Sequence, residues 1–495
     1  MRLNEICRLF GRKSRKKMKS LKQKQLPYRV YDLIPSQQSM YMMVKYSFHK
    51  QLVQIPVSFA IDHKIDFELL ERAFNLEIER NDSLRLRFFK EGGKVKQYFL
   101  PYADPLKIPV MHFATLQEQE AFFGADAQKP VFFEKETFRI RFFSNEETGG
   151  HGVYFVTSHL ALDAMGIINM FFDLLKIYLS LATGARMPKP LQSYETYICE
   201  EFARLADKEK MQRHAEFYKH YFLRGGEPLY AGVHGPAFLE QTRLKKKNPE
   251  LRVPYAYNPL YDKSDFLSKT IPADQAKKIF DFCEEHKISP ELLLTFGLRT
   301  YCSAINYRTP DVFMMLLCSK RATPQEKRMG GCVTQPLQLR TIFGEEMSFE
   351  EAIEETAAVR TQLFRHSRYP YLAALQLSRD IYNYSAIQGP ACMMFSWIPV
   401  PSLGVLPFHL DFRTYNLGRY FTPLYVISHP DSVTGGLTLD YMYRVKLSTK
   451  ADIEALHENT VRTILAGIEN PKITVGELLD RVIPKDEIKG EEEHA

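Results

Sequence analysis

The segment Ser158-His159-Leu160-Ala161-Leu162-Asp163-Ala164 joins two stretches of different hydrophobic periodicity. Before it, residues 153–157 (VYFVT) read as an apolar strand. After it, apolar residues recur at helical spacing, which predicts an amphipathic helix over residues 165–181. We therefore expect His159 at a strand-to-helix corner, with its imidazole in a cleft and the Asp163 carboxylate turned inward to fix the local backbone.

A second strand is predicted just upstream of this corner. Residues 137–143 (TFRIRFF) alternate apolar side chains with arginine, the two-residue period of a half-buried strand. Residues 146–152 then turn the chain. The pattern H-x-x-x-D alone is common and most often means an exposed His and a helix-capping Asp, so its interpretation depends on the rest of the chain.

Further segments follow one another in a recognisable order. They are 35–41 (PSQQSMY), 80–88 (RNDSLRLRF), 194–197 (YETY), 288–294 (ISPELLL), 329–334 (MGGCVT) and 366–371 (HSRYPY). Ser289 and Pro290 suit a helix N-cap and first helical residue. Together with segment 158–164, the order of these segments over residues 28–479 resembles that in the condensation domains of nonribosomal peptide synthetases. More broadly, it is similar to the chloramphenicol-acetyltransferase-like acyltransferases.

The core motif of that family reads H-H-x-x-x-D-G, and this chain departs from it twice. Ser158 replaces the first His, and Ala164 replaces the Gly. Ser158 can hydrogen-bond locally, so its presence is compatible with catalysis. Ala164 is the more serious change, because a methyl group takes up room beside a substrate and resists some φ values open to Gly.

The resemblance implies an α/β fold, an α+β sandwich of two chloramphenicol-acetyltransferase-like lobes. They would form a pseudo-dimer with a tunnel between them, which donor and acceptor enter from opposite sides. It places His159 in the tunnel as the general base, since a neutral His near pH 7 can remove a proton from the acceptor. Ala164, Gly166, Thr334 and His366 are candidate tunnel-lining residues.

Asp163 is expected to support the site rather than react. In the family this residue pairs with an Arg at a strand end of the second lobe, where this chain has Ser319-Lys320-Arg321. Arg321 is therefore the first choice of partner, with Arg139 and Arg141 as local alternatives.

The chain divides into five predicted regions. These are a basic, disordered arm (1–27), a first lobe (28–185), a helical connection and linker (186–265), a second lobe (266–482) and a charged tail (483–495). The connection is expected to be helical over 192–223 and irregular after it. In the second lobe we expect helices at 273–286, 290–306 and 450–468, and strands at 312–318, 422–428 and 436–443. The last strand–strand–helix order mirrors the first lobe, as expected for a duplicated fold.

Composition limits the alternatives. The seven cysteines are scattered and contain no C-x-x-C pair, which favours reduced thiols in a cytoplasmic protein over disulfides or a zinc site. The remaining histidines, among them His112, His214, His220 and His409, lack metal-ligand spacing, so no metal is expected. No apolar run reaches the length of a membrane-spanning helix, so we expect a soluble protein.

The positive charge is concentrated near the N-terminus. The net charge is +7, but residues 1–24 hold ten Lys or Arg against Glu5 alone, so the body is nearly neutral. The arm suits an anionic membrane or nucleic acid, or is simply solvated. Nothing in the body suggests nucleic-acid binding. The run Lys245-Lys246-Lys247 could meet a phosphorylated donor, but such runs are more often solvated.

Two classes of function remain open. The first is an acyltransferase that moves an acyl group from a thioester, on a carrier protein's phosphopantetheine or on coenzyme A, to a small amine or alcohol. No permanently bound cofactor is expected, and we expect a monomer. The second is a non-catalytic module that binds a carrier protein or an acyl ligand. Neither a G-x-S-x-G elbow nor a phosphate-binding loop is present in the sequence, so a covalent Ser mechanism and ATP use are not expected.

Overall fold

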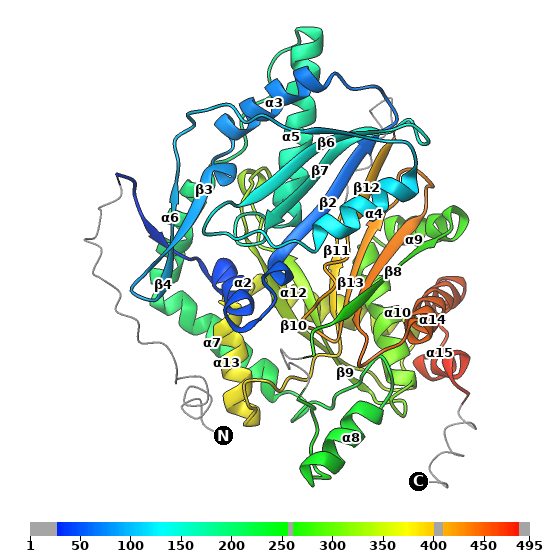
Figure 1. The fold of residues 1–495 in the computed structure, drawn as a ribbon. Helices are drawn as coiled ribbons and strands as arrows, with labels where there is room; N and C mark the ends of the chain where they lie inside the picture. The colour runs from blue at the N-terminus through cyan, green and yellow to red at the C-terminus, as the bar shows by residue number, and fades with distance from the viewer. Residues whose placement is uncertain (1–26, 256–260, 400–408, 485–495) are drawn as a thin grey trace.

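The computed structural model describes residues 27–255, 261–399 and 409–484 (Figure 1). The basic segment 12–17 and nearly all of the charged tail lie outside the described residues. The structure is built on three sheets, with strand orders β12-β2-β7-β6-β5, β10-β9-β11-β13-β14-β8 and β1-β4-β3. The first two sheets are the centres of two lobes.

The first lobe has helices on both faces of its sheet. β2 (Gln54–Ile61), β6 (Phe138–Asn145) and β7 (His151–Ser158) pair antiparallel, and β5 (Val110–Phe113) runs parallel to β6. Helices α3 (Phe67–Arg80) and α5 (Ala164–Thr183) cover one face, and α4 (Leu116–Ala127) covers the other (Figure 1).

β7 is buried along nearly its whole length because it lies inside this double-covered sheet. Val153 and Phe155 pack toward α3 and α5, whereas Tyr154 and Val156 pack toward α4. By length and composition α5 could cross a membrane, but it packs against the sheet and beside α3, as a core helix does. The predicted strands and helix around the corner are therefore present.

The second lobe repeats this plan. β8 (Ser264–Ile271), β14 (Leu437–Arg444) and β13 (Leu424–Pro430) pair antiparallel in that order, and β11 (Met394–Trp397) runs parallel to β13. The order and relative directions of these four strands match those of β2, β7, β6 and β5 in the first lobe. Two more strands, β9 (Asp311–Ser319) and β10 (Thr334–Ile342), extend the sheet beyond β11. Its helices are α9 (Ala273–Glu285), α10 (Pro290–Ala304), α11 (Pro324–Lys327), α12 (Phe349–Arg365), α13 (Tyr371–Tyr382), α14 (Lys450–Glu469) and α15 (Val475–Val482).

One strand departs from the predicted lobe boundary. β12 (Leu410–Thr414) belongs by sequence to the second lobe, yet it pairs antiparallel with β2 and completes the first lobe's sheet (Figure 1). Phe412 packs partly buried against the first lobe's core, next to Phe59. The segment 266–482 is thus not a self-contained lobe.

The third sheet and the connecting helices fill one side of the molecule. The small sheet consists of β1 (Tyr31–Asp32), β3 (Leu86–Glu91) and β4 (Lys94–Phe99), and it packs with α2 (Pro35–Tyr46) and α6 (Tyr194–Ala206). Two short 3₁₀ turns, η1 (Lys50–Val53) and η2 (Asp82–Arg85), flank it. Helix α7 (Lys208–Leu223) continues from α6.

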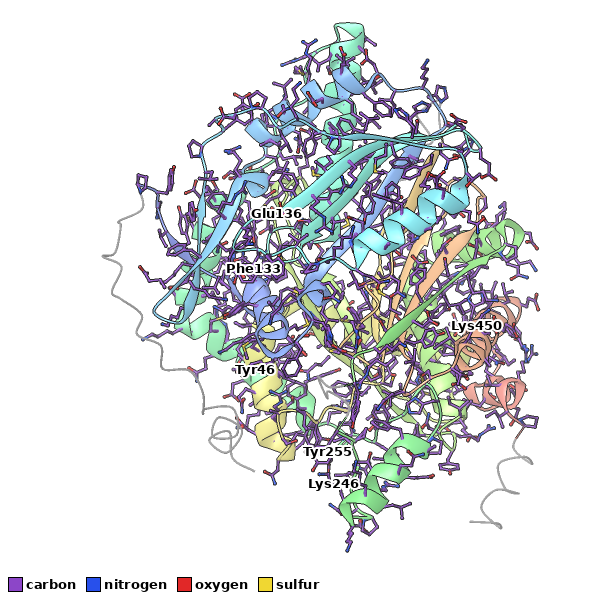
Figure 2. All side chains as sticks on the ribbon, in the orientation of Figure 1. Tyr46, Phe133, Glu136, Lys246, Tyr255 and Lys450 are labelled. Carbon is purple, nitrogen blue, oxygen red and sulfur yellow. The ribbon has the colours of Figure 1, made fainter. Side chains whose placement is uncertain are left out.

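The prediction that the chain is irregular between residue 223 and the second lobe is wrong for α8 (Ala237–Lys246). The lysine run therefore ends a helix, where positive charge is favourable next to the helix C-terminus. Lys246 also lies over the ring of Tyr255, with Nζ 4.5 Å from the ring centroid (Figure 2).

Candidate active site

The corner after β7 is held by its own backbone. The N–H of His159 donates to the carbonyl oxygen of Val53 at 3.0 Å. Ser158 is buried, its carbonyl accepts from the N–H of Ala161, and its hydroxyl accepts from the N–H of Leu160 at 3.4 Å. Ser158 thus makes the local hydrogen bond expected of it, inside the corner.

Asp163 is the N-cap of α5 and is almost completely buried. One carboxylate oxygen accepts from the N–H of Gly166 at 2.8 Å. The other accepts from the N–H groups of Val333 and Thr334, at 2.8 and 3.0 Å. A single side chain therefore ties the first helix turn of one lobe to the start of β10 in the other.

Arg321 completes this arrangement from the second lobe. Its Nη1 donates to Asp163 Oδ2 at 2.8 Å, and its Nη2 donates to the carbonyl oxygens of Gly330 and Gly331, both at 3.1 Å. Burial by itself would raise the pKa of Asp163, but the charge and hydrogen bond of Arg321, with the backbone donors, hold that pKa below its usual value. Asp163 is therefore an ionised structural link and has no proton to exchange.

The two local alternatives for that partner lie elsewhere. Arg139 donates to Asp126, near the end of α4, at 3.1 Å, and Arg141 lies 3.7 Å from the same carboxylate. Both arginines are on the α4 face of the sheet, whereas the Asp163 carboxylate faces β10. The first choice, Arg321, is therefore confirmed, and Arg139 and Arg141 are not partners of Asp163.

Glycines allow the loop before β10 to lie close to the corner. Gly331 has φ +79°, and a Cβ there would overlap the Tyr194 ring. A Cβ on Gly166 would lie 2.8 Å from the Gly331 carbonyl oxygen. Gly166 is buried under this loop. Because it has no side chain, the backbone of the loop can lie directly against it.

His159 is half-buried at the junction of the lobes. Burial lowers the pKa of its imidazole below the usual value, and the negative charge of Asp163 offsets only part of this effect. The ring is therefore neutral near pH 7, as a general base must be. Its Nδ1 atom lies 3.8 Å from the sulfur of Cys332.

Ala164 begins α5, Thr334 begins β10, and His366 lies at the end of α12. Ala164 is half-buried and is the first residue of α5, outside the positive-φ region, so its backbone carries no strain. Thr334 is buried, and its hydroxyl donates to the Cys318 carbonyl oxygen. His366 instead caps the end of α12 and stacks on Phe217 of α7, with ring centroids 3.8 Å apart.

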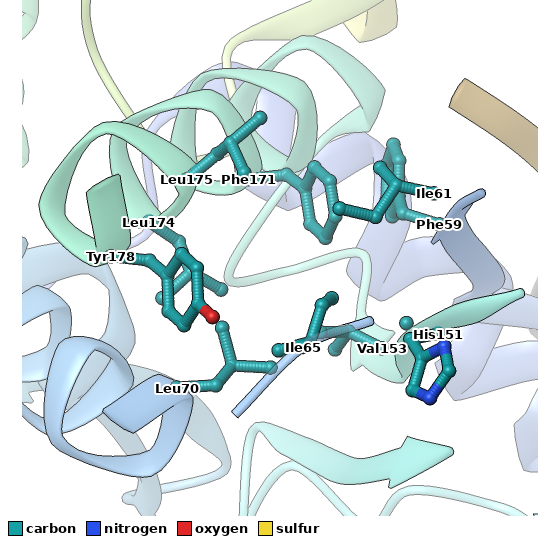
Figure 3. Close-up of a pocket in the computed structure, with 11 residues that line it drawn as sticks. Phe59, Ile61, Ile65, Leu70, His151, Val153, Phe171, Leu174, Leu175 and Tyr178 are labelled. Atoms are coloured by element: carbon teal, nitrogen blue, oxygen red, sulfur yellow. The ribbon is translucent and has the colours of Figure 1, made fainter. Parts of the chain in front are cut away.

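Two cavities in the described part of the chain lie away from His159. One is an apolar space of about 20 Å³ in the first lobe, between the sheet, α3 and α5 (Figure 3). It has room for about one water molecule, too little for a substrate. The other, of about 290 Å³, lies along α14 beside the end of β8. Among the described residues, no group of three or more His, Cys, Asp or Glu side chains could hold a metal ion.

Two features of the site were not predicted. Cys332 was part of a recognised segment, but nothing in the letters MGGCVT indicates contact with a residue 173 positions away. Lys320, next to Arg321, is fully buried, and its Nζ donates to Glu201 of α6 at 2.7 Å. A lysine beside an arginine at a strand end more often reaches solvent, so the sequence carried no signal for this pair.

The comparisons place the chain in a family. The Condensation domain model matches residues 28–383, so the chain belongs to the condensation-domain family. Among curated proteins, it is 22% identical over 425 residues to surfactin synthase subunit 1 of Bacillus subtilis (strain 168). It is 20% identical over 421 residues to a plipastatin synthase subunit of the same organism. Each alignment covers 84% of this chain but only 11% and 15% of those much longer relatives.

Solved structures share the fold. The first condensation domain of the calcium-dependent antibiotic synthetase, in complex with a substrate analogue, matches with a TM-score of 0.74 at 16% identity. That match covers 91% of this chain and 98% of the other. The starter condensation domain of rhizomide synthetase, bound to C8-CoA and Leu-SNAC, matches with a TM-score of 0.72 at 15% identity, covering 90% and 96%. The two-lobed architecture is therefore that of condensation domains, a family of acyl-transferring enzymes.

Proposed function

We propose that this protein transfers an acyl group from a thioester to an amine or hydroxyl acceptor, with His159 as the general base. The observation that carries the proposal is a neutral, half-buried imidazole at the junction of the lobes, on a corner fixed by Asp163 and Arg321. Membership of the condensation-domain family supports the same chemistry.

The reaction uses the ring as a proton carrier. The acceptor's nitrogen or oxygen attacks the thioester carbonyl carbon while His159 Nε2 takes its proton. The tetrahedral carbon then expels the thiolate, which receives that proton, so the products are an amide or ester and a free thiol. Asp163 keeps the corner in place through its hydrogen bonds with Arg321 and with backbone N–H groups. Because these bonds occupy its carboxylate, it takes no part in the proton transfer.

The donor is either acyl-coenzyme A or an acyl group on a carrier protein's phosphopantetheine. Either is a substrate rather than a resident cofactor, and the acceptor is a small amine or alcohol. We further propose that the protein acts as a cytoplasmic monomer. The exposed lysines at the end of α8 are a surface that a phosphorylated donor could meet, although Lys246 is already engaged with Tyr255.

The alternative is a non-catalytic module that binds a carrier protein or an acyl ligand. The presence of Ser158 and Ala164 in the motif favours it. The geometry weakens that argument, because Ser158 serves the corner internally and Ala164 has ordinary helical backbone. The remaining argument for the non-catalytic module is the methyl group of Ala164, which a substrate would have to pass.

The test is thiol release from acyl thioesters on coenzyme A and on carrier pantetheine, with mixed amine and alcohol acceptors. We expect acceptor-dependent release that falls about 10²-fold or more in His159→Ala, the scale of losing a general base. His112→Ala, an exposed histidine on β5, is the matched control. If the native protein and His159→Ala are equally silent while a carrier or thioester still binds, the binding module is the correct account.

A further inference from the structure

Cys332 is the side chain nearest to Nδ1 of His159 for which the structure gives a contact. Its sulfur lies 3.8 Å from that nitrogen, within the range of a weak hydrogen bond to sulfur. The side chain of Cys332 is completely buried. It therefore faces the ring of His159 and has no surface open to a substrate.

The position of this thiol is fixed by the backbone around it. The carbonyl oxygen of Cys332 accepts from the Tyr194 hydroxyl at 2.9 Å. The next N–H, of Val333, donates to Asp163, and the preceding Gly331 is packed against the Tyr194 ring. The groups that fix the corner of His159 therefore also fix the sulfur, so the ring and the thiol have little freedom to move apart.

The chemical state of the thiol limits what it can do. Burial raises the pKa of Cys332 well above its usual value, so it remains a neutral thiol. A neutral, inaccessible thiol is not a nucleophile for an acyl group. A thiol is a weak hydrogen-bond donor and a weak acceptor, and as an acceptor it can receive the hydrogen of an imidazole N–H.

A neutral imidazole carries its hydrogen on one nitrogen, and the group beside the other nitrogen decides which. If Nδ1–H points at the sulfur, Nε2 has a free lone pair. If the hydrogen is on Nε2, the ring cannot accept a proton from a substrate there. The proton transfer proposed for Nε2 requires the first arrangement.

We propose that Cys332 is a positioning residue that holds the His159 ring with its hydrogen on Nδ1 and leaves Nε2 to accept the acceptor's proton. This inference rests on the proposed function, because it assigns a task to the base named there. It adds that the base is oriented by a thiol, whereas the Asp163 carboxylate is committed to Arg321 and the backbone.

The experiment compares Cys332→Ala and Cys332→Ser with the native protein. The control is Cys318→Ala, which removes another buried thiol, on β9, whose sulfur contacts the Ser319 carbonyl oxygen. Proteins labelled with ¹⁵N-histidine report which nitrogen of His159 bears the hydrogen, with the signal assigned by its absence in His159→Gln. Acyl transfer is measured on the same samples as kcat and KM.

We expect Nδ1 to be protonated in the native protein, and the Nδ1 signal to shift in Cys332→Ala but not in Cys318→Ala. In Cys332→Ala, kcat should fall about 3- to 10-fold with KM unchanged, the scale of one weak hydrogen bond. Cys332→Ser, whose hydroxyl can still accept, should recover part of that loss.

Two results overturn the inference: a native ring protonated on Nε2, or a Cys332→Ala protein in which both the ring signals and kcat match the control. A native protein that shows the Nδ1–H ring and the shift in Cys332→Ala, but no transfer with any thioester, contradicts the proposed function and leaves the positioning contact standing.

Discussion

At the scale of single residues, the proposed base and the carboxylate that fixes its corner have separate partners. Asp163 accepts from three backbone N–H groups and from Arg321, so it has no capacity left for His159. The imidazole has a thiol beside its Nδ1 atom. It is therefore a base of modest strength, unlike a histidine whose Nδ1 donates to a carboxylate.

The pH dependence of transfer follows from this environment. Burial holds the pKa of His159 below its usual value of 6.5, with Asp163 and the neutral thiol of Cys332 facing it. The ring should therefore be mostly neutral at pH 6.5, and the midpoint of the fall in kcat/KM should lie below pH 6.5, along a single-protonation curve. A pH–rate profile with a pantetheine thioester checks this. A midpoint at or above 6.5 would contradict the assigned environment of the base.

At this scale the sequence singled out candidate residues but not most of their contacts. His159, Asp163 and Arg321 could be selected because their residue types suit the roles that the family resemblance implies. The sulfur of Cys332 could not, because a contact between positions 159 and 332 depends on how two lobes meet. His366 is expected beside the tunnel on the same resemblance, and that placement stays a prediction; its ring stacks on Phe217 of α7.

At the scale of elements, α7 and α12 meet through a pair of histidines. Nδ1 of His214 lies 2.9 Å from Nδ1 of His366, so one ring donates and the other accepts. Burial lowers the pKa of both rings, and His366, Lys210 and Arg213 lower that of His214 further. Protonating both rings would place two donors face to face and break the contact.

This pair should make the protein less stable in acid. A histidine whose pKa is lower in the folded than in the unfolded chain stabilises the fold above pH 6.5 and loses that contribution as the pH falls below it. His214→Gln should therefore flatten the decline in urea-unfolding free energy between about pH 7 and pH 5. His112→Gln, at an exposed position on β5, is the control. If the unfolding free energy of His214→Gln declines with falling pH as steeply as that of the native protein, the histidine pair does not titrate in this range.

The elements found from sequence are those whose pattern is complete within one stretch of chain. β6, β7 and α5 have clear periodicity, and Ser289 caps α10 as predicted. β12 has five residues, and its partner β2 is distant in sequence, so no local signal assigns it to the first lobe. α8 was missed because its neighbouring Pro and Gly residues read as a loop.

At the scale of the whole molecule, buried charges join the connection to the second lobe. Glu201 of α6 is 1% exposed at its side chain and pairs with Lys320 and Arg204, at 2.7 and 2.9 Å. Arg368 lies 3.6 Å from the same carboxylate and also binds Glu326 of α11. The strand end that supplies Arg321 to the site is therefore fixed by its neighbour Lys320.

Removing the Glu201 carboxylate should lower the free energy of unfolding substantially. Glu201→Gln leaves Lys320, Arg204 and Arg368 without their shared anion, and we expect a loss of about 3–5 kcal/mol, as for a broken buried ion pair. Lys320→Met should cost less, because Arg204 still neutralises Glu201. Urea unfolding followed by fluorescence measures both. Equal losses in the two variants would contradict the central role of Glu201.

The two lobes share a plan but not a site. In the first, β7 leads through His159 to Asp163, the cap of α5; in the second, β14 leads through Val445 to Thr449, the cap of α14. The spacing is the same, yet an apolar residue stands where the first lobe has its imidazole. The proposed base therefore belongs to the first lobe alone, and the second lobe contributes Arg321 and the loop before β10 to the corner.

The strand β12 has a consequence for how the protein is made. The first lobe's sheet lacks the strand beside β2 until residues 410–414 have been synthesised. A chain cut after residue 383 would hold all that the family model matches and still have β2 as an open edge. On the ribosome, the lobe that carries His159 must therefore wait, incomplete and prone to pair with other chains, until most of the second lobe has emerged.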